Sequence, residues 1–421
     1  MRKMKDSGIE WVGAIPQNWQ LSKIGSLYTQ RNEKVSDKDY QPLSVTMQGI
    51  LPQLATAAKT DDGDNRKLVR VGDFAINSRS DRRGSCGISP LDGSVSLINI
   101  ILTPRTAMHP GYYNWLFHTT LFADEFYKWG HGIVADLWTT RWQEMKSITV
   151  PVPEYAEQER IAAFLDAECA EIDAVLEKTR ASIEEYKKLK QAVITQAVTK
   201  GVRGDRPMKD SGIEWIGDIP AEWAASKIKY CTEFAPSCNT SHLSEDSLVT
   251  FTPMECIKNG YFENREAHFS ALSSSYTQYQ DGDIVFAKVT PCFENGNIAI
   301  MQGLSAGVGF GSSELFVIRP QSINTEFIFY YLQNDIFKQY ACATMTGTGG
   351  LKRVSPTFVR NYSVFIPCNE EQLEIVRYLN EKCSGIEVLI AKKQQYLTEI
   401  ENYKKSLIYE YVTGKKEVHP L

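Results

Sequence analysis

The chain has 421 residues, of which 43% are hydrophobic, and its formal net charge at pH 7 is −5. This length allows more than one domain, and the composition is that of an ordinary soluble protein. Free-standing nucleic-acid-binding proteins are usually basic, so DNA binding by this chain would need a local basic surface or partners that share the phosphate contacts.

The sequence contains no long apolar segment. No run reaches the roughly 18 apolar residues of a membrane helix, and the first residues are charged, without the apolar stretch of a secretory signal. The nine cysteines and six histidines are scattered without a Cys-x-x-Cys pair, which argues against a zinc site. We therefore expect a cytoplasmic protein with reduced thiols and no membrane association.

The chain opens with a block that it later repeats. Residues 4–19 return as residues 208–223, a shift of 208 − 4 = 204, with 12 of 16 positions identical. This identifies an internal duplication. Glycine, proline and two tryptophans in each block predict a non-helical lead-in whose rings are packing anchors. Because the second block follows the first long helix, we expect the first block to pack on the end of the second helix and to bring the chain ends together.

A globular segment follows over residues 20–150. Short β-branched and aromatic runs predict strands, and one aromatic-rich run predicts a helix over 112–129. The predicted strands cover residues 42–48, 67–77, 95–103 and 147–152.

Residues 151–201 predict a long helix between two prolines and a glycine. Its apolar residues recur at alternating steps of four and three, with Thr179 and Lys190 in the remaining positions of this heptad seam. A helix over 157–199 has 43 residues and would span about 65 Å, close to two turns of DNA. The apolar seam residues are Ile172, Leu176, Ile183, Tyr186, Val193 and Ala197.

Residues 367–414 repeat this helix at a shift of 386 − 172 = 214. Lys393 and Lys404 take the polar positions of the seam, and two helices with matching seams are expected to pair with each other. Between the helices, residues 224–366 follow the plan of the first globular segment but differ in most positions, which favours two recognition modules on one scaffold. The apolar seam residues are Ile386, Ile390, Leu397, Ile400, Leu407 and Tyr411.

No enzyme signature is present. The sequence lacks a phosphate-binding loop, a nucleophile elbow, a metal-binding His-Glu-x-x-His helix and the Asn/Asp-Pro-Pro-aromatic motif of adenine methyltransferases. The carboxylate pairs 184–185 and 370–371 fall on predicted helices, where a solvated face is the expected role. We therefore predict no catalytic, metal-binding or cofactor-binding residue in this chain.

Basic and polar residues gather in loops at equivalent positions of both copies, over residues 78–85 in the first copy and 288–296 in the second. A further loop of the second copy covers residues 346–353, and its counterpart in the first copy begins at residues 130–132. Arginine binds guanine through two hydrogen bonds or pairs with phosphate. An ordinary solvated loop is the alternative at each position, and the occurrence in both copies favours DNA contact. The candidate DNA-binding residues are Arg79, Arg82, Arg83, Lys288, Thr290, Asn295, Lys352 and Arg353.

Over essentially its whole length the pattern resembles the DNA-specificity subunits of type I restriction–modification systems. The resemblance rests on the paired Gly-Ile-Glu-Trp-x-Gly-x-Ile-Pro-x-x-Trp blocks and on the Pro-x-x-x-Glu-Gln motifs that end at Gln158 and Gln372. It implies an α+β fold in which target-recognition domains (1–150 and 206–366) alternate with conserved helical regions (151–205 and 367–421). The helices would pair as an antiparallel coiled coil within an internal pseudo-two-fold repeat.

The resemblance also implies a function and partners. Each recognition domain would read one half of a bipartite, asymmetric double-stranded DNA target, and the helices would set the spacer. Two modification subunits would dock at exposed positions near Gln158 and Gln372, and restriction subunits would join them. S-adenosylmethionine, ATP and Mg²⁺ are expected on these partner subunits, and this chain would be non-catalytic. The alternatives are a scaffold or regulatory relative without DNA specificity, and a metal-dependent nuclease.

Overall fold

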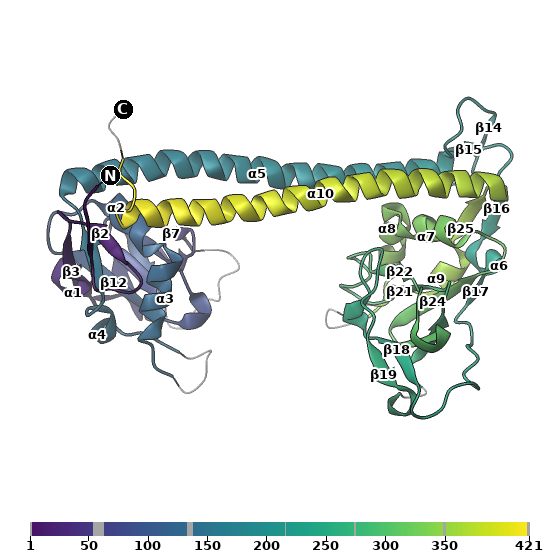
Figure 1. Ribbon diagram of the computed structural model, residues 1–421, viewed down its shortest axis with the longest axis horizontal. Helices are drawn as coiled ribbons and strands as arrows, with labels where there is room; N and C mark the ends of the chain where they lie inside the picture. The colour runs from purple at the N-terminus through teal and green to yellow at the C-terminus, as the bar shows by residue number, and fades with distance from the viewer. Residues whose placement is uncertain are drawn as a thin grey trace. The chain divides into compact units, whose positions relative to one another are not determined.

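The protein, represented by a computed structural model, contains two compact units (Figure 1). The structure describes residues 2–53, 63–132, 138–214, 216–272, 275–347 and 351–418. Unit 1 comprises Met1–Arg180 and Gln395–Leu421, and unit 2 comprises Ala181–Gln394. Each unit combines a globular part with segments of two long helices, so the chain has a mixed α/β fold. The predicted four-domain division stays a prediction, because these units are divided inside the long helices.

The strands of unit 1 are short and antiparallel, and its sheets have the strand orders β10-β9-β12-β4, β11-β8-β5, β1-β2, β13-β3 and β6-β7. The short helices are α1 (Ile24–Leu27), α2 (Pro110–Phe117), α3 (Thr120–Lys128) and α4 (Trp142–Met145). The strands are β1 (Met4–Asp6), β2 (Ala14–Pro16), β3 (Gln20–Lys23), β4 (Tyr28–Arg31), β5 (Lys34–Val35), β6 (Leu43–Thr46), β7 (Gly49–Pro52), β8 (Arg66–Val69), β9 (Phe74–Asn77), β10 (Cys86–Ile88), β11 (Gly93–Val95), β12 (Asn99–Pro104) and β13 (Thr149–Val152).

Unit 2 repeats the central sheet of unit 1, with the order β17-β24-β21-β22, and adds a sheet of order β19-β18-β23-β20 in which β18 and β23 are parallel. The pairs β14-β15 and β16-β25 match β1-β2 and β3-β13. Its strands are β14 (Met208–Asp210), β15 (Asp218–Pro220), β16 (Ala224–Lys227), β17 (Thr232–Phe234), β18 (Leu248–Thr252), β19 (Glu266–His268), β20 (Thr277–Gln280), β21 (Ile284–Ala287), β22 (Ile298–Ile300), β23 (Val308–Gly311), β24 (Leu315–Pro320) and β25 (Ser363–Ile366). Its short helices are α6 (Ile228–Cys231), α7 (Thr325–Gln333), α8 (Asp335–Ala343) and α9 (Pro356–Asn361).

Two predicted elements are each divided in the structure. The strand predicted over 67–77 is β8 and β9, separated by a turn in which Gly72 has a φ of +87°. The helix predicted over 112–129 is α2 and α3, because the Thr119 hydroxyl accepts a hydrogen bond from the backbone N–H of Phe122 at 3.2 Å and so caps a new helix. The other predicted strands correspond to β6, β12 and β13.

Two long helices, α5 (Tyr155–Lys200) and α10 (Asn369–Val412), carry the predicted seams. Each ends near a glycine with left-handed backbone, Gly201 at φ +74° and Gly414 at φ +71°, as helix C-termini commonly do. Every side chain of both predicted seams is buried or half-buried. The seams are therefore packing surfaces in the structure.

Within each unit, α5 and α10 contact each other. In unit 1, Lys404 Nζ donates to Asp173 Oδ1 at 2.6 Å, and Arg180 Nη2 donates to Glu401 Oε1 at 2.6 Å. Residue numbers rise along α5 while they fall along α10, so the two segments run in opposite directions.

The helix segments of unit 2 are joined in the same way. Lys190 Nζ donates to Glu387 Oε1 at 2.6 Å. Nearer the end of α5, Arg203 forms two hydrogen bonds with Glu374, at 2.8 and 2.9 Å. These segments are also antiparallel.

The repeated lead-in blocks end in tryptophans that are buried at the starts of the long helices. Trp19 is 1% exposed, and its indole N–H donates to Glu157 Oε2 at 2.9 Å. Trp223 is 0% exposed, and its indole N–H donates to Glu371 Oε2 at 3.1 Å. The predicted role as packing anchors is confirmed for Trp19 and Trp223, while Trp215 lies outside the described residues.

The first lead-in block packs on the end of α10 inside unit 1. Lys415 Nζ and Tyr409 Oη both donate to the carbonyl of Val12, at 2.6 and 3.1 Å. At the end of α5 in unit 2, Lys200 Nζ donates to the carbonyl of Ile216 at 2.7 Å, and Ile216 occupies the position of Val12 in the repeat. The expected meeting of the two chain ends is therefore confirmed.

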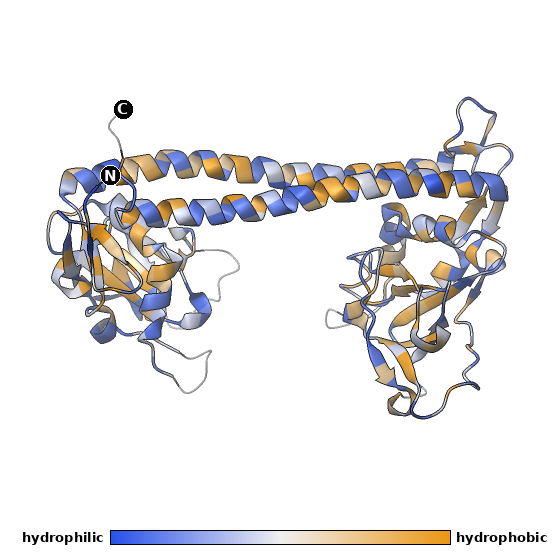
Figure 2. Cartoon of the chain, in the orientation of Figure 1, coloured by the Kyte–Doolittle hydropathy of each residue, from blue (hydrophilic) through white to orange (hydrophobic). Residues whose placement is uncertain are grey.

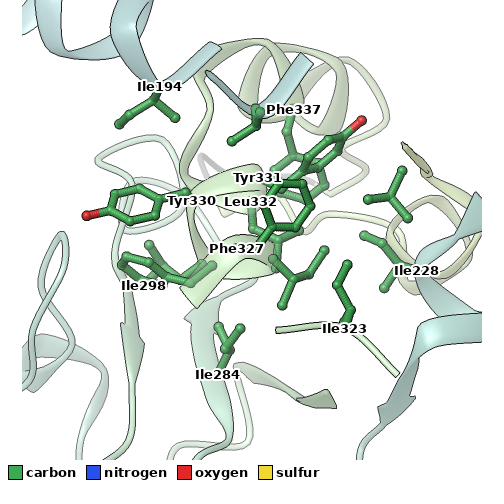
Figure 3. Packing of buried hydrophobic residues seen from close by; sticks show 14 of the residues in the cluster. Ile194, Ile228, Ile284, Ile298, Ile323, Phe327, Tyr330, Tyr331, Leu332 and Phe337 are labelled. Carbon is green, nitrogen blue, oxygen red and sulfur yellow. The ribbon is translucent and has the colours of Figure 1, made fainter. Parts of the chain in front are cut away.

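Each unit has its own hydrophobic core. Figure 2 shows hydrophobic residues gathered among the strands and helices of each unit, and a mixture of both kinds along α5 and α10. In unit 2, Phe327 and Tyr331 of α7 pack in one cluster with Ile194 of α5 (Figure 3). In unit 1, Tyr113 of α2 belongs to one cluster with Leu407 of α10. The long helices are thus part of both cores.

Two further observations concern membrane-spanning segments and the cysteines. No helix in the described ranges is both long and apolar enough to cross a membrane. All nine cysteines are free thiols. Burial raises the pKa of Cys86 to about 12, which keeps this thiol protonated at neutral pH.

Replacing Gly414 by alanine should destabilise unit 1 more than the same change at Gly8. Both glycines have left-handed backbone, with φ of +71° and +68°, so alanine costs each about 1 kcal/mol of strain. A Cβ at Gly414 would lie 2.5 Å from Pro16 and 2.9 Å from Trp19, whereas none of the described residues comes within 4 Å at Gly8. We expect Gly414→Ala to lower the free energy of unfolding by about 1–3 kcal/mol more, in denaturant titrations. Equal losses would contradict tight packing of the lead-in on α10.

Candidate nucleic-acid interface

In unit 1 two loops that are distant in sequence are held together by backbone hydrogen bonds. The loop after β9 is closed where the Asn77 N–H donates to the Ser85 carbonyl at 2.9 Å. Arg79 of this loop and His131, after α3, each form a β-bridge with Thr139. The loop after β9 and the loop after α3 therefore form one continuous surface.

The three predicted arginines of unit 1 are exposed on this surface. Arg82 Nε lies 3.7 Å from Asp81 Oδ2, and Arg83 forms an ion pair with Asp124. Within the described part of the chain, the guanidinium of Arg79 has no hydrogen-bond or ion-pair partner. Such exposed cations are available to phosphates or base edges.

Unit 2 builds the same arrangement. Val289, in the loop after β21, and Thr346, after α8, each form a β-bridge with Arg353. The Thr290 N–H donates to the Lys352 carbonyl at 3.0 Å, and the Lys352 N–H donates to Thr290 Oγ1 at 3.0 Å. The structure thus brings together three residues that the sequence placed in two separate candidate loops.

The bridges show which positions of the two units correspond. Arg79 bridges Thr139 in unit 1 in the way that Val289 bridges Arg353 in unit 2. Each bridge therefore contains one arginine. In unit 1 the arginine belongs to the loop after β9, whereas in unit 2 it belongs to the loop after α8. This supports the predicted correspondence between the loops that begin near residues 130 and 346.

The other candidates lie around the same loops. Lys288 is half-buried, with its Nζ 5.7 Å from the centre of the Phe316 ring. Asn295 is exposed in the turn after β21 and donates its backbone N–H to the carbonyl of Pro291 at 3.0 Å. Residues 133–137 and 348–350, the middle parts of the second loops, lie outside the described residues.

Glu314 is a residue of this surface that the sequence did not indicate. It precedes β24, and its carboxylate holds Arg353 through Nε–Oε2 and Nη2–Oε1 contacts of 3.0 and 2.6 Å. The hydrogen bonds of Arg353 lower the pKa of Glu314, and those of Glu314 raise the pKa of Arg353. The two residues are far apart in the chain, so no local pattern predicts the pair.

The two glutamines predicted near the docking surface are buried and hold the fold together. Gln158 is 3% exposed, and its Oε1 accepts from the backbone N–H of His109 at 2.9 Å, just before α2. Gln372 is 1% exposed, and its Oε1 accepts from the N–H of Asn324 at 2.7 Å, just before α7. The Nε2 of each glutamine donates to the proline carbonyl five residues earlier, at 2.8 and 2.9 Å. Subunit docking stays a prediction for exposed positions nearby.

The glutamates beside them form ion pairs with arginines that lie two residues before each lead-in block. Arg2 Nη2 lies 2.6 Å from Glu157 Oε1, and Arg206 Nη1 lies 2.6 Å from Glu371 Oε1. Glu371 is 0% exposed, so the predicted solvated face is wrong for this residue, although Glu370 is exposed. An arginine and an indole N–H supply the charge and hydrogen bond that a buried carboxylate requires.

The described ranges hold no group of three or more His, Cys, Asp or Glu side chains that could bind a metal ion. Beside the carboxylates Asp81 and Glu294, these loops expose guanidinium, ammonium, hydroxyl and amide groups. These are the groups that contact phosphates and base edges in protein–DNA interfaces.

Comparison with known proteins relates the chain to one group. Residues 240–399 match the model of the type I restriction modification DNA specificity domain. The chain is 32% identical over 189 residues to the type I restriction enzyme EcoEI specificity subunit of Escherichia coli, covering 43% of this chain and 32% of that relative. It is 31% identical over 196 residues to the EcoAI specificity subunit of the same species, covering 45% and 32%. The matches thus span about a third of the length of these two relatives.

The chain is similar to type I restriction enzyme specificity subunits. A longer match, 20% identical over 432 residues, relates it to the EcoKI specificity subunit of Escherichia coli strain K12 and covers 96% of this chain and 90% of the relative. This match spans both copies of the duplication, whose lead-in blocks recur at a shift of 204 and whose long helices recur at a shift of 214.

Solved structures share this fold. A structure from a study of complex assembly and conformational transition of the type I R-M system has a TM-score of 0.71 at 14% identity, covering 96% of this chain and 99% of that one. The HsdS subunit from Thermoanaerobacter tengcongensis has a TM-score of 0.50 at 16% identity, covering 96% and 98%. At these identities the likeness shows the fold alone.

Replacing Gln372 by alanine should destabilise unit 2. The change removes the buried hydrogen-bond partner of the Asn324 N–H and of the Pro367 carbonyl. We expect the free energy of unfolding to fall by about 1–3 kcal/mol in denaturant titrations. Gln395→Ala, at an exposed position of α10, is the matched control and should change it by less than about 0.5 kcal/mol. Indistinguishable effects of the two variants would mean that Gln372 does not join α10 to α7.

Proposed function

We propose that this chain is the DNA-specificity subunit of a type I restriction–modification enzyme, and that unit 1 and unit 2 each read one half of a bipartite DNA target. One observation carries the proposal: the same bridged pair of loops occurs in both units with different side chains. A shared backbone with different hydrogen-bonding groups is what two readers of different base sequences require.

The asymmetry of the target follows from the residues on the bridges. Unit 1 offers exposed Arg79, Arg82 and Arg83, whereas unit 2 offers Lys352 and an Arg353 that is held by a carboxylate. Different donors select different base edges, so the two half-sites have different sequences.

We infer that α5 and α10 form an antiparallel coiled coil with a pseudo-two-fold repeat and set the spacer between half-sites. The ion pair Asp173–Lys404 in unit 1 corresponds to Glu387–Lys190 in unit 2, since 173 + 214 = 387 and 190 + 214 = 404. Equivalent charged contacts beside a heptad seam are typical of coiled coils.

Two modification subunits are the proposed partners of the exposed helix faces. Tyr155 and Leu373, close to the buried motif glutamines, are 50% and 52% exposed. Exposed apolar residues also recur at matching positions of the two helices, which supports two equivalent docking surfaces. These further residues are Val175, Leu189, Leu389 and Tyr403.

The remaining chemistry is assigned to the partners. In this proposal the chain is non-catalytic and cytoplasmic, the modification subunits bind S-adenosylmethionine, and restriction subunits use ATP and Mg²⁺. The acidic net charge of −5 supports shared DNA binding, because the partners would then supply part of the phosphate contact.

Methylation mapping tests the proposal. The full chain is expressed with a cognate modification subunit, and host DNA is sequenced for modified adenines. We expect one split motif with a fixed gap, and exchange of residues 20–150 should change only one half of it. Co-purification without methylation would favour a regulatory relative, failure to co-purify would favour a scaffold, and metal-dependent cleavage by the purified chain alone would favour a nuclease.

Arg82→Ala should weaken binding through one half-site only, because Arg82 lies in the unit 1 loop that follows β9. The matched control is Arg70→Ala, which removes an exposed charge at the opposite end of β9. We expect Arg82→Ala to weaken binding of the complex by about 1–3 kcal/mol on intact duplexes, and Arg70→Ala to have little effect. An equal loss on duplexes that lack this half-site would assign Arg82 to a phosphate contact.

A further inference from the structure

The ion pair between Arg353 and Glu314 leaves one edge of the guanidinium open. Glu314 accepts from Nε at 3.0 Å and from Nη2 at 2.6 Å, and so occupies the side edge of the group. A guanidinium has five N–H donors in a fixed plane. The two N–H donors of Nη1 and the second N–H of Nη2 have no partner among the described residues. One donor from each of these two nitrogens forms the fork that matches guanine O6 and N7.

Both ends of this side chain are held in place. The backbone of Arg353 exchanges two hydrogen bonds with Thr346, at 3.1 and 2.8 Å, and bridges Val289 on its other side. Glu314 is itself anchored, since its carbonyl accepts from the N–H of Lys288 at 3.1 Å. An arginine that is held in one rotamer before binding loses less conformational entropy when it meets a base.

The charge of the pair argues against a phosphate contact. Arg353 is 47% exposed and Glu314 is 30% exposed at their side chains, and together they are close to neutral. Neutral pairs contribute little to the counterion-release term that dominates phosphate binding. Directional hydrogen bonds to a base edge do not require a net positive charge.

Among the described residues of unit 1, no carboxylate takes the place of Glu314. Its equivalent in unit 1 is Ile98, because the Ser78 N–H donates to the Ile98 carbonyl where the Lys288 N–H donates to the Glu314 carbonyl. Arg79 on the unit 1 bridge therefore has no neighbouring carboxylate at this position. Within the described ranges, an arginine held by a carboxylate at the bridge occurs in unit 2 and not in unit 1, as expected for a residue that determines one half-site.

Building on the proposed function, we propose that Arg353 reads one guanine of the half-site bound by unit 2, and that Glu314 is the positioning residue that holds Arg353 for this contact. The ligand is the O6 and N7 edge of a guanine in the major groove of double-stranded DNA.

The test uses the full chain in complex with a cognate modification subunit, and a duplex library in which every position of the half-site is varied in turn. Arg353→Lys keeps the charge but loses the fork, and we expect the preference for one G·C pair to fall about ten- to a hundredfold while other positions keep their preferences. Glu314→Gln should reduce the same preference about three- to tenfold at the same position. Glu255→Gln, which breaks an exposed ion pair with Arg265 in the same unit, is the matched control and should leave the preferences unchanged.

The outcomes separate this inference from the proposed function. A wild-type complex without any split motif would reject the proposed function itself. A wild-type motif whose unit 2 half-site contains only A·T pairs would overturn the guanine assignment alone. If Glu314→Gln strengthened binding to all duplexes alike, Glu314 would only neutralise charge, and the positioning role would be rejected. A change confined to one G·C position in both variants would support it.

Discussion

The fold depends on two carboxylates at the starts of the long helices. Glu157 and Glu371 each accept an indole N–H from a lead-in block and pair with the arginine two residues before that block. A hydrogen bond to a charged group contributes about 1.5–3 kcal/mol, and removing one partner of a buried pair costs about 3–5 kcal/mol. The neighbouring Gln158 and Gln372 fasten the same helix starts to α2 and α7. Each Glu-Gln pair is thus a joint between a lead-in, a long helix and a globular part.

The duplication preserves these joints while the surfaces beyond them differ. In both units the central sheet has the same strand order, and the loop after its second strand is bridged to a distant loop. The backbone of that surface is determined by hydrogen bonds that any side chain permits, so its side chains are free to diverge. This separation explains how one scaffold presents Arg79 in unit 1 and Val289 at the equivalent position of unit 2.

Features that depend on local sequence were predictable, and features that depend on distant contacts were not. The heptad seams and the anchoring roles of Trp19 and Trp223 follow from periodicity and repetition, and their burial agrees with the prediction. The division of the predicted helix at Thr119 follows from one cap that the aromatic pattern concealed. The contact that buries Glu371 against Trp223 and the contact between Arg353 and Glu314 each join residues that are far apart in the chain. No spacing rule encodes such pairs. The sequence therefore predicted which loops carry the candidate residues, but not which of these residues contact one another.

A second pair of contacts shows how this divergence proceeds. Asp73 and Asp283 precede equivalent strands, and each is buried and bound by an arginine. The arginine is Arg31 of β4 in unit 1 but Arg319 of β24 in unit 2, which lies on a different strand of the equivalent sheet. The aspartate of the ion pair keeps its position before the equivalent strand, while the arginine that binds it comes from a different strand in each unit. The bridge arginines of the two units differ in the same way, so the two recognition surfaces correspond through backbone pairing, and a residue-by-residue alignment of the copies conceals that correspondence.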